Sequence, residues 1–310
     1  MVEKGAMVKE TVKTGRRTFR RLVPGVEFTD RIERSPRADR PIRVLAKAVR
    51  RRIGPGPLRD LLHGVPIGKP LHPPLANLSL GLWAATAVLD MTRTDPRASR
   101  VLVAGGLVTA MPAMAAGVTD WSALHREQQR VGFVHAIANL AALGLYTGSL
   151  VFRMAGRDRT GRTLSFAGLG AASLGGYLGG HLAYRQAAGA NHAESVTHLV
   201  PLGWHDLCEI GDLPDGRPVT RRLGYIDLFV LRVGVNVTVL ADQCAHLAGP
   251  LHQGRLISEE GTACVVCPWH GSTFRLSDGA VVHGPATAPQ PSFETRVRRD
   301  GVLQVRPAQT

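Results

Sequence analysis

Four long stretches of this chain contain no Lys, Arg, Asp or Glu, and they constrain the fold more than any other feature. They cover residues 71–89, 101–119, 131–152 and 163–184, which are 19, 19, 22 and 22 residues long. About 20 residues of helix cross the hydrocarbon core of a bilayer, so each stretch is long enough for one crossing. A buried soluble helical bundle is the alternative, but four uncharged runs in succession favour a four-helix transmembrane domain over residues 71–184.

The charge of the chain is concentrated before these stretches. Residues 1–70 hold 18 Lys and Arg against 7 Asp and Glu, whereas residues 194–310 hold 10 against 12. Such a basic arm is attracted to anionic lipid on the cytoplasmic face of a membrane, and this interpretation is stronger than nucleic-acid binding. Prolines interrupt the arm at positions 24, 36, 41, 55 and 57, so we expect it to be partly disordered, with short interfacial helices. With the arm inside and four crossings, residues 194–310 are also predicted to be cytoplasmic.

Two short loops in the last third of the chain carry metal-binding side chains. The first reads Cys244-x-His246 and is followed by Gly249. The second reads Cys267-x-x-His270 and is followed by Gly271. Two thiolates and two imidazoles suit either a tetrahedral zinc ion or a [2Fe–2S] cluster in which Cys binds one iron and His the other. One Cys and one His from each of two loops favours the cluster over zinc.

These loops, with the Gly and Pro residues around them, resemble the Rieske family over residues 196–307. The resemblance implies that Cys244 and Cys267 bind the buried iron, while His246 and His270 bind the outer iron. The quinol-oxidising members carry a disulfide between the loops, at positions that are Gly249 and Trp269 in this sequence. No such disulfide is possible here.

The residues around the implied cluster predict a low to intermediate reduction potential. The high-potential members place a Tyr hydroxyl near a ligand sulfur, where this chain has Phe274. Hydrogen bonds to cluster sulfurs raise the potential, and a Phe ring donates none. Ser272 keeps a hydroxyl that can donate one, and Trp269 lies between the ligands of the second loop.

The segments around the loops predict an antiparallel β domain over residues 194–310, joined to the membrane domain by a short linker at 185–193. We expect strands near 196–202, 228–231, 235–241, 263–266 and 281–285, and a terminal hairpin over 294–305 that turns at Asp300-Gly301. Cys264 falls in one of these strands, so we interpret it as a buried residue rather than a ligand. The predicted fold is therefore an α-helical membrane domain followed by an all-β sandwich with a cluster-binding subdomain.

Three histidines lie near the predicted cytoplasmic ends of the membrane stretches, and ionisable residues there justify a functional hypothesis. His135 and His181 are the most plausible pair of axial ligands for a b-type haem, with His72 as the third candidate. The alternative is that these histidines bind headgroups, water or a neighbouring carbonyl group.

A second resemblance covers the membrane region. His63, Lys69, His72, Trp83 and Asp120 stand in motifs similar to those of a four-helix bacterial membrane family of unknown function, which is sometimes fused to a Rieske domain. That family commonly has His where this chain has Lys69. The family supplies no activity to transfer.

The leading functional hypothesis is a membrane-anchored protein that carries single electrons between a redox partner protein, or a quinone, and an acceptor. A Rieske-type oxygenase is the second hypothesis, but it needs a mononuclear iron site of two His and a carboxylate. Only His283 follows His270, and the usual Asp/Glu-x-x-His-x-x-x-x-His pattern does not occur. A reductase component or a redox or iron sensor at the membrane is the third. We therefore expect an electron-transfer component rather than a stand-alone catalyst.

Overall fold

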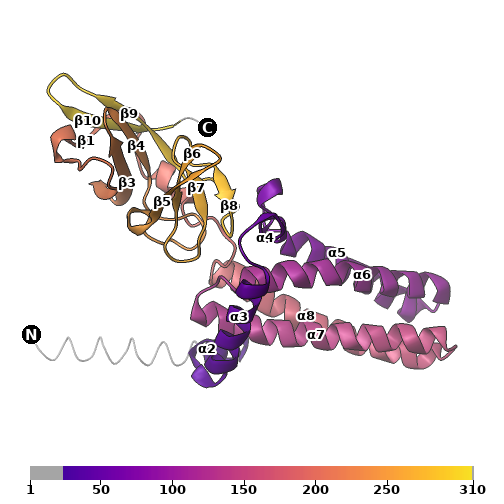
Figure 1. Ribbon diagram of the computed structural model, residues 1–310. Coiled ribbons are helices and arrows are strands. Elements are labelled where there is room, and N and C mark those ends of the chain that lie inside the picture. The colour runs from indigo at the N-terminus through magenta and orange to yellow at the C-terminus, as the bar shows by residue number, and fades with distance from the viewer. Residues whose placement is uncertain (1–23, 309–310) are drawn as a thin grey trace, which may run out of the picture. The chain divides into compact units, whose positions relative to one another are not determined.

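The computed structural model describes residues 24–308 (Figure 1). These residues form two compact units, one of residues 24–46 and 125–186, the other of residues 47–124 and 187–308. The first 23 residues of the predicted arm lie outside the described residues. The rest of the arm is mostly helical, with α2 (Pro24–Arg34), α3 (Asp39–Arg52) and α4 (Pro57–His63).

Each charge-free stretch coincides with one long helix. These helices are α5 (His72–Thr92), α6 (Pro96–Trp121), α7 (Arg126–Met154) and α8 (Asp158–Gly180), and a π-helical turn over His181–Arg185 continues the last. The α5–α6 connection is short, and Asp95 at its end caps α6 by accepting hydrogen bonds from the backbone N–H groups of Arg97 and Ala98 at 2.8 and 3.0 Å.

Glycines allow the helices of each hairpin to approach closely. In the second unit, Gly106 of α6 lies so close to Trp83 of α5 that an added Cβ would fall 2.1 Å from the indole nitrogen. In the first unit, Gly175 of α8 lies against Asn139 of α7 in the same way, whereas Gly176 faces open space. Small residues on one helix face are a usual basis for helix packing in membranes.

Three of the described helices, α5, α6 and α7, are long and apolar enough to cross a membrane. Helix α8 has the length, but its many glycines lower its hydropathy. Large apolar side chains on α6 remain exposed in the structure, among them Val101, Val108 and Met111. These exposed residues leave an apolar outer face on the helix.

The β domain contains two antiparallel sheets, as predicted. The larger has the strand order β1-β10-β9-β4-β3-β2, and the smaller has the order β5-β6-β7-β8. The strands are β1 (His205–Glu209), β2 (Val219–Leu223), β3 (Ile226–Val233), β4 (Asn236–Ala241), β5 (Arg255–Glu259), β6 (Thr262–Val266), β7 (Thr273–Arg275), β8 (Val281–His283), β9 (Ser292–Val297) and β10 (Val302–Pro307). Their core includes Leu228 and Leu240 from the larger sheet and Phe274 from the smaller. Cys264 is buried in β6, in agreement with its interpretation as a strand residue.

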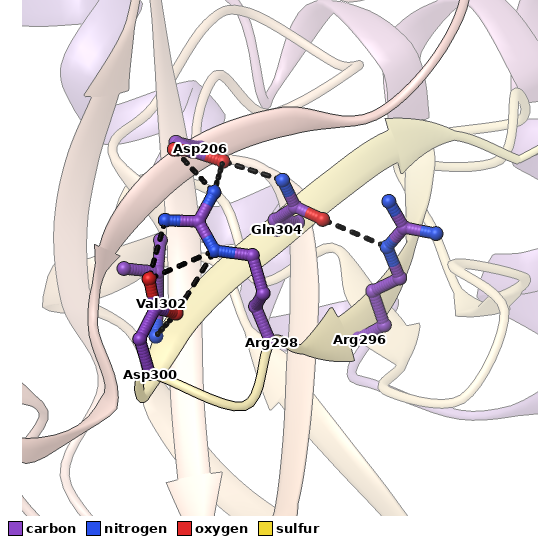
Figure 2. A network of polar contacts seen from close by, with 6 residues as sticks. All are labelled: Asp206, Arg296, Arg298, Asp300, Val302 and Gln304. Atoms are coloured by element: carbon purple, nitrogen blue, oxygen red, sulfur yellow. Dashed lines mark hydrogen bonds and ion pairs between the residues drawn. The ribbon is translucent and has the colours of Figure 1, made fainter.

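The terminal hairpin turns at Asp300-Gly301 as predicted, and ion pairs fix it to β1. Figure 2 shows the guanidinium of Arg298 between Asp300 and Asp206, at 2.7 and 3.2 Å. Gln304 extends the network, since its amide donates to Asp206 at 2.5 Å. The hydrogen bond from Arg298 lowers the pKa of the Asp300 carboxyl.

The strand expected near 196–202 is wrong. Glu194–His198 forms a short 3₁₀ helix instead. Val196, within this helix, and Val200, just after it, are the buried valines of the segment. Together with Ala193 they belong to the core of the β domain, so this segment is part of the domain.

Candidate metal centre

Two loops of the second unit bring the predicted ligands together. The first follows β4, and the N–H of Cys244 donates to the carbonyl oxygen of Gly249 at 2.9 Å, closing it into a tight turn. The second joins β6 to β7, and the N–H of Cys267 donates to the carbonyl oxygen of Ser272 at 2.8 Å. Gly271 has φ = 80°, a left-handed conformation that glycine adopts without steric cost.

The four candidate ligands form two pairs rather than one group. Cys244 and Cys267 are buried, and their thiols are hydrogen-bonded to each other. The rings of His246 and His270 meet edge to face, with their centroids 5.1 Å apart. Among residues 24–308, no three His, Cys, Asp or Glu side chains surround one point as a single ion requires. Separate thiol and imidazole pairs therefore fit a two-iron cluster better than one tetrahedral zinc ion.

Hydrogen bonds make one of the two thiols acidic. The bond with the Cys244 thiol, together with the backbone N–H groups of Trp269 and His270, lowers the pKa of Cys267 to about 7 although burial opposes this. The pKa of Cys244 is raised, because the same hydrogen bond holds its proton and the thiol is buried. Since thiolates bind metal, the second loop stabilises the ligating form of its cysteine.

Gly249 lies where the two loops touch. A Cβ on Gly249 would fall 2.8 Å from the Cys267 sulfur and 3.1 Å from the Trp269 ring. Gly249 and Trp269, the positions at which the quinol-oxidising members carry a disulfide, are thus in contact here. The glycine backbone lies directly against the indole ring of Trp269. This contact leaves no room for a side chain at Gly249.

The remaining predicted neighbours of the site occupy different environments. Ser272 is fully buried, and its hydroxyl oxygen accepts a hydrogen bond from the N–H of Ala286 at 3.0 Å. Phe274 is fully buried in β7. Trp269 is 50% exposed, and its ring centroid is 6.4 Å from that of His270.

Sequence reasoning missed a buried glutamine that supports the first loop. The Gln290 side chain accepts from the N–H of Ala245 at 3.0 Å and donates to the carbonyl oxygens of Ala241 and Gln243 at 2.8 and 2.7 Å. Gln290 is 1% exposed. Nothing in the local sequence signals this role, because the bonds span more than 40 residues.

Asp242 and His252 form a second support that the sequence did not reveal. The two carboxylate oxygens of Asp242 contact the N–H and the ring nitrogen Nδ1 of His252, at 2.7 and 2.6 Å. This pair closes the first loop across its base.

His135, a predicted haem ligand, lies on α7 in the first unit. Its Nδ1 is 2.8 Å from the carbonyl oxygen of Gly175, and the side-chain amide of Asn139 lies 3.1 Å from its Nε2. A haem ligand must offer a ring nitrogen to the iron. Both ring nitrogens of His135 have protein partners instead.

The other two candidates also have protein partners. The Nε2 of His181 lies 2.6 Å from a carboxylate oxygen of Glu33 in the first unit. The Nδ1 of His72 lies 2.8 Å from the carbonyl oxygen of Ala113 in the second. Nothing among the described residues supports a haem site. His72 and His135 each contact a carbonyl group, as the alternative expected, whereas His181 contacts a carboxylate.

Motif residues of the membrane region pair with one another. The Nδ1 of His63 lies 2.6 Å from a carboxylate oxygen of Asp120, and His63 is 1% exposed. The ring of His72 packs on Gly117, where a Cβ would fall 2.7 Å from its Nδ1. Lys69 is exposed and belongs to neither contact.

Two opposed loops that pair thiol with thiol and imidazole with imidazole, carried on an antiparallel β domain, define an iron–sulfur domain of the Rieske type. The model of the Rieske [2Fe-2S] domain matches residues 203–294, and the chain belongs to this family. Residues 68–192 match a second model, described as predicted membrane protein (DUF2231). Membership of the Rieske family implies a [2Fe–2S] cluster and electron transfer.

Curated relatives of the β domain are ferredoxins. Ferredoxin CarAc of Metapseudomonas resinovorans is 32% identical over 101 residues, which are 32% of this chain and 90% of the relative. The anthranilate 1,2-dioxygenase ferredoxin subunit of Burkholderia cepacia is 30% identical over 36% of this chain and 97% of its own. Among solved structures, the ferredoxin of carbazole 1,9a-dioxygenase from Nocardioides aromaticivorans IC177 is 21% identical over 34% of this chain and 98% of that chain, with a TM-score of 0.31.

Proposed function

We propose that this chain is a membrane-anchored carrier of single electrons, in which Cys244 and Cys267 bind one iron and His246 and His270 bind the other. The observation that carries the proposal is the separation of the four donors into a buried thiol pair and an imidazole pair. When bound, a Rieske cluster takes up and releases one electron. The chain holds, insulates and tunes that group.

The imidazole side of the site is where electrons enter and leave in this proposal. The thiol pair is buried at 1 and 4% exposure, whereas His270 is partly exposed beside the half-exposed ring of Trp269. A partner that approaches this edge comes nearer to the outer iron than one that approaches from any strand of the β domain. Trp269 adds apolar area to that contact, as aromatic residues do in protein interfaces.

A redox protein is the proposed partner. The relatives of the β domain include a dioxygenase ferredoxin subunit, so we infer that this chain exchanges electrons with a reductase or an oxygenase component. A quinone in the bilayer is the alternative donor, and the apolar helices are the reason to test it. A sensor that reports the redox state of the cluster remains the second candidate function, with the basic arm as its contact to a partner.

We further propose that the helical domain anchors the chain in the cytoplasmic membrane through four crossings. The support is the length and hydropathy of α5, α6 and α7 and the exposed apolar residues of α6. Anionic lipid is the proposed contact of the basic arm. This arrangement keeps the β domain close to the bilayer on the cytoplasmic side.

Electron paramagnetic resonance of the detergent-purified, dithionite-reduced protein tests the proposed function. We expect a rhombic Rieske signal from the native chain and from Cys208→Ser, which changes a cysteine outside the two loops. Cys244→Ser is expected to abolish the signal. A signal that survives Cys244→Ser, or bound zinc with no signal in the native chain, would contradict the proposed ligand set.

Two further measurements on the same sample separate the alternatives. Reduction of the cluster by a quinol would support the quinone as donor, and failure of every quinol tried would remove it. A b-type haem bound by two of His72, His135 and His181 is no part of our proposal, because nothing among the described residues supports one and both ring nitrogens of His135 have protein partners. A positive pyridine haemochrome assay would reinstate it.

A further inference from the structure

Helix α4 carries three polar side chains that contact the second cluster loop, β8 and α6 of the second unit. It begins at Pro57 and ends at His63, and Arg59, Asp60 and His63 all point to other parts of the second unit. The membrane hairpin and the β domain of that unit meet through this short helix.

Asp60 attaches the helix to β8. One carboxylate oxygen lies 2.7 Å from the Nδ1 of His283, and the other accepts a hydrogen bond from the N–H of Gly284 at 2.9 Å. Gly284 has no space for a side chain, since a Cβ there would fall 3.0 Å from Val65 and 3.1 Å from His63. The β domain is therefore in close contact with α4 and with the 3₁₀ turn (Val65–Ile67) that follows it.

His63 attaches the helix to α6 on the other side. Its Nδ1 contacts the Asp120 carboxylate at 2.6 Å, and its Nε2 accepts from the Nε of Arg59 at 3.4 Å. Because Nε2 accepts, the proton of the neutral ring is on Nδ1, where it donates to Asp120. This chain of contacts fixes the orientation of the Arg59 guanidinium.

The free end of that guanidinium reaches the cluster loop. The Nη2 of Arg59 donates to the carbonyl oxygen of His270 at 3.3 Å. His270 is a proposed ligand of the outer iron, so the positive charge of Arg59 contacts the backbone of a proposed ligand. Burial lowers the pKa of Arg59, but a guanidinium stays charged at neutral pH.

We propose that Arg59 is a positioning residue that raises the reduction potential of the cluster by placing a fixed positive charge against the His270 carbonyl group. Uptake of an electron makes the site more negative, and a nearby positive charge stabilises the reduced state more than the oxidised one. The helix of the membrane domain thereby sets a property of the cluster that the β domain alone would lack. This inference rests on the proposed function, because it requires the cluster.

The test is a redox titration of the Rieske signal in the full chain. Arg59→Gln is expected to lower the midpoint potential, and Arg59→Lys is expected to retain most of the native value because it keeps the charge. Arg52→Gln is the matched control, since it removes an exposed arginine from the neighbouring helix α3.

Hydrogen exchange of the peptide that contains residues 268–272 supplies a readout that does not need the cluster. We expect faster exchange in Arg59→Gln than in Arg52→Gln, because the contact with His270 is lost. A potential in Arg59→Gln equal to that of Arg52→Gln would overturn the proposal. So would an equal fall in Arg59→Gln and Arg59→Lys together with faster exchange in both, because loosening of the loop and not loss of charge would then be the cause.

The proposed function fails separately from this inference. If the native chain shows no Rieske signal, the electron carrier is rejected and the role of Arg59 in setting a potential is rejected with it. If the signal is present in every variant and the potential does not move, only the inference about Arg59 is wrong.

Discussion

Gly249 is the residue at which the two cluster loops are most tightly constrained. We predict that Gly249→Ala destabilises the β domain by about 1–3 kcal/mol, because the new methyl group would overlap the Cys267 sulfur and the Trp269 ring. The protein should also purify with less iron per chain. Gly211→Ala is the matched control, since a Cβ there would meet nothing within 4 Å. Thermal unfolding and iron content are the measurements, and equal values for the two variants would contradict the prediction.

Ser272 is the remaining hydroxyl beside the site. Its oxygen accepts from the N–H of Ala286, which leaves its own hydrogen to be donated. A hydrogen bond worth about 1 kcal/mol to the reduced site corresponds to a potential change on the order of 40 mV. We predict that Ser272→Ala lowers the midpoint potential by that order. Ser258→Ala, an exposed serine in β5, should leave the potential unchanged, and a fall in both variants would count against a specific role.

The candidate ligands could be located from the sequence, whereas the residues that support their loops could not. The spacing of Cys and His within each short loop indicates the proposed donor set, because that pattern is local in the sequence. Gln290 and Arg59 act on the same loops from 45 and 211 residues away. Contacts at such separations depend on the completed fold, and a single sequence contains no periodic signal for them.

At the scale of elements, the contact between α4 and β8 is predicted to depend on pH. The hydrogen bond to Asp60 raises the pKa of His283, and the charge of Glu259 adds to this. The charged form of His283 is therefore favoured in the folded state. The stabilisation of the α4–β8 contact by charged His283 is complete below the ordinary histidine pKa of 6.5. It is lost as the pH rises through the raised pKa of His283.

Exchange of the Gly284 amide, corrected for its intrinsic pH dependence, measures this contact. We expect protection to fall as the pH rises above neutrality, since the N–H of Gly284 donates to the same carboxylate. Asp60→Asn should remove the pH dependence, and Glu259→Gln should reduce it. Protection that is constant with pH in the native chain would show that His283 does not control the contact.

The predicted elements succeeded where a pattern was long and failed where it was short. Charge-free runs of about 20 residues located all four long helices, because such runs have few alternative conformations in a membrane protein. The prediction of a strand near 196–202 was wrong because two buried valines in seven residues fit either the alternation of a strand or a turn of helix. Burial against the β core decided between them, and burial is not visible in a short sequence pattern.

At the scale of the whole molecule, the number of crossings determines which side of the membrane carries the cluster. Four crossings place both termini on the same side, which the basic arm predicts to be the cytoplasmic side, whereas three place them on opposite sides. We predict four, because some of the glycines that lower the hydropathy of α8, among them Gly168 and Gly175, are on its face against α7. A helix covered by its neighbour needs less apolar surface of its own.

Protease protection of N- and C-terminal epitope tags tests this topology. In intact spheroplasts, both tags should be protected, and in inverted vesicles both should be cleaved. Digestion of only one tag in spheroplasts would establish an odd number of crossings. Tags that are cleaved in both preparations would place neither end behind the membrane.

The segment that leads into the β domain determines where the protein can be divided. The N–H of His192 donates to the carbonyl oxygen of Ala245 at 2.9 Å, and the side chain of Gln243 donates to the carbonyl oxygen of His192 at 2.6 Å. A soluble fragment that began at 203, where the family match begins, would lose these bonds and the buried Val196 and Val200. A fragment for expressing the β domain by itself should therefore start near residue 187. Such a fragment keeps the segment that supports the first cluster loop.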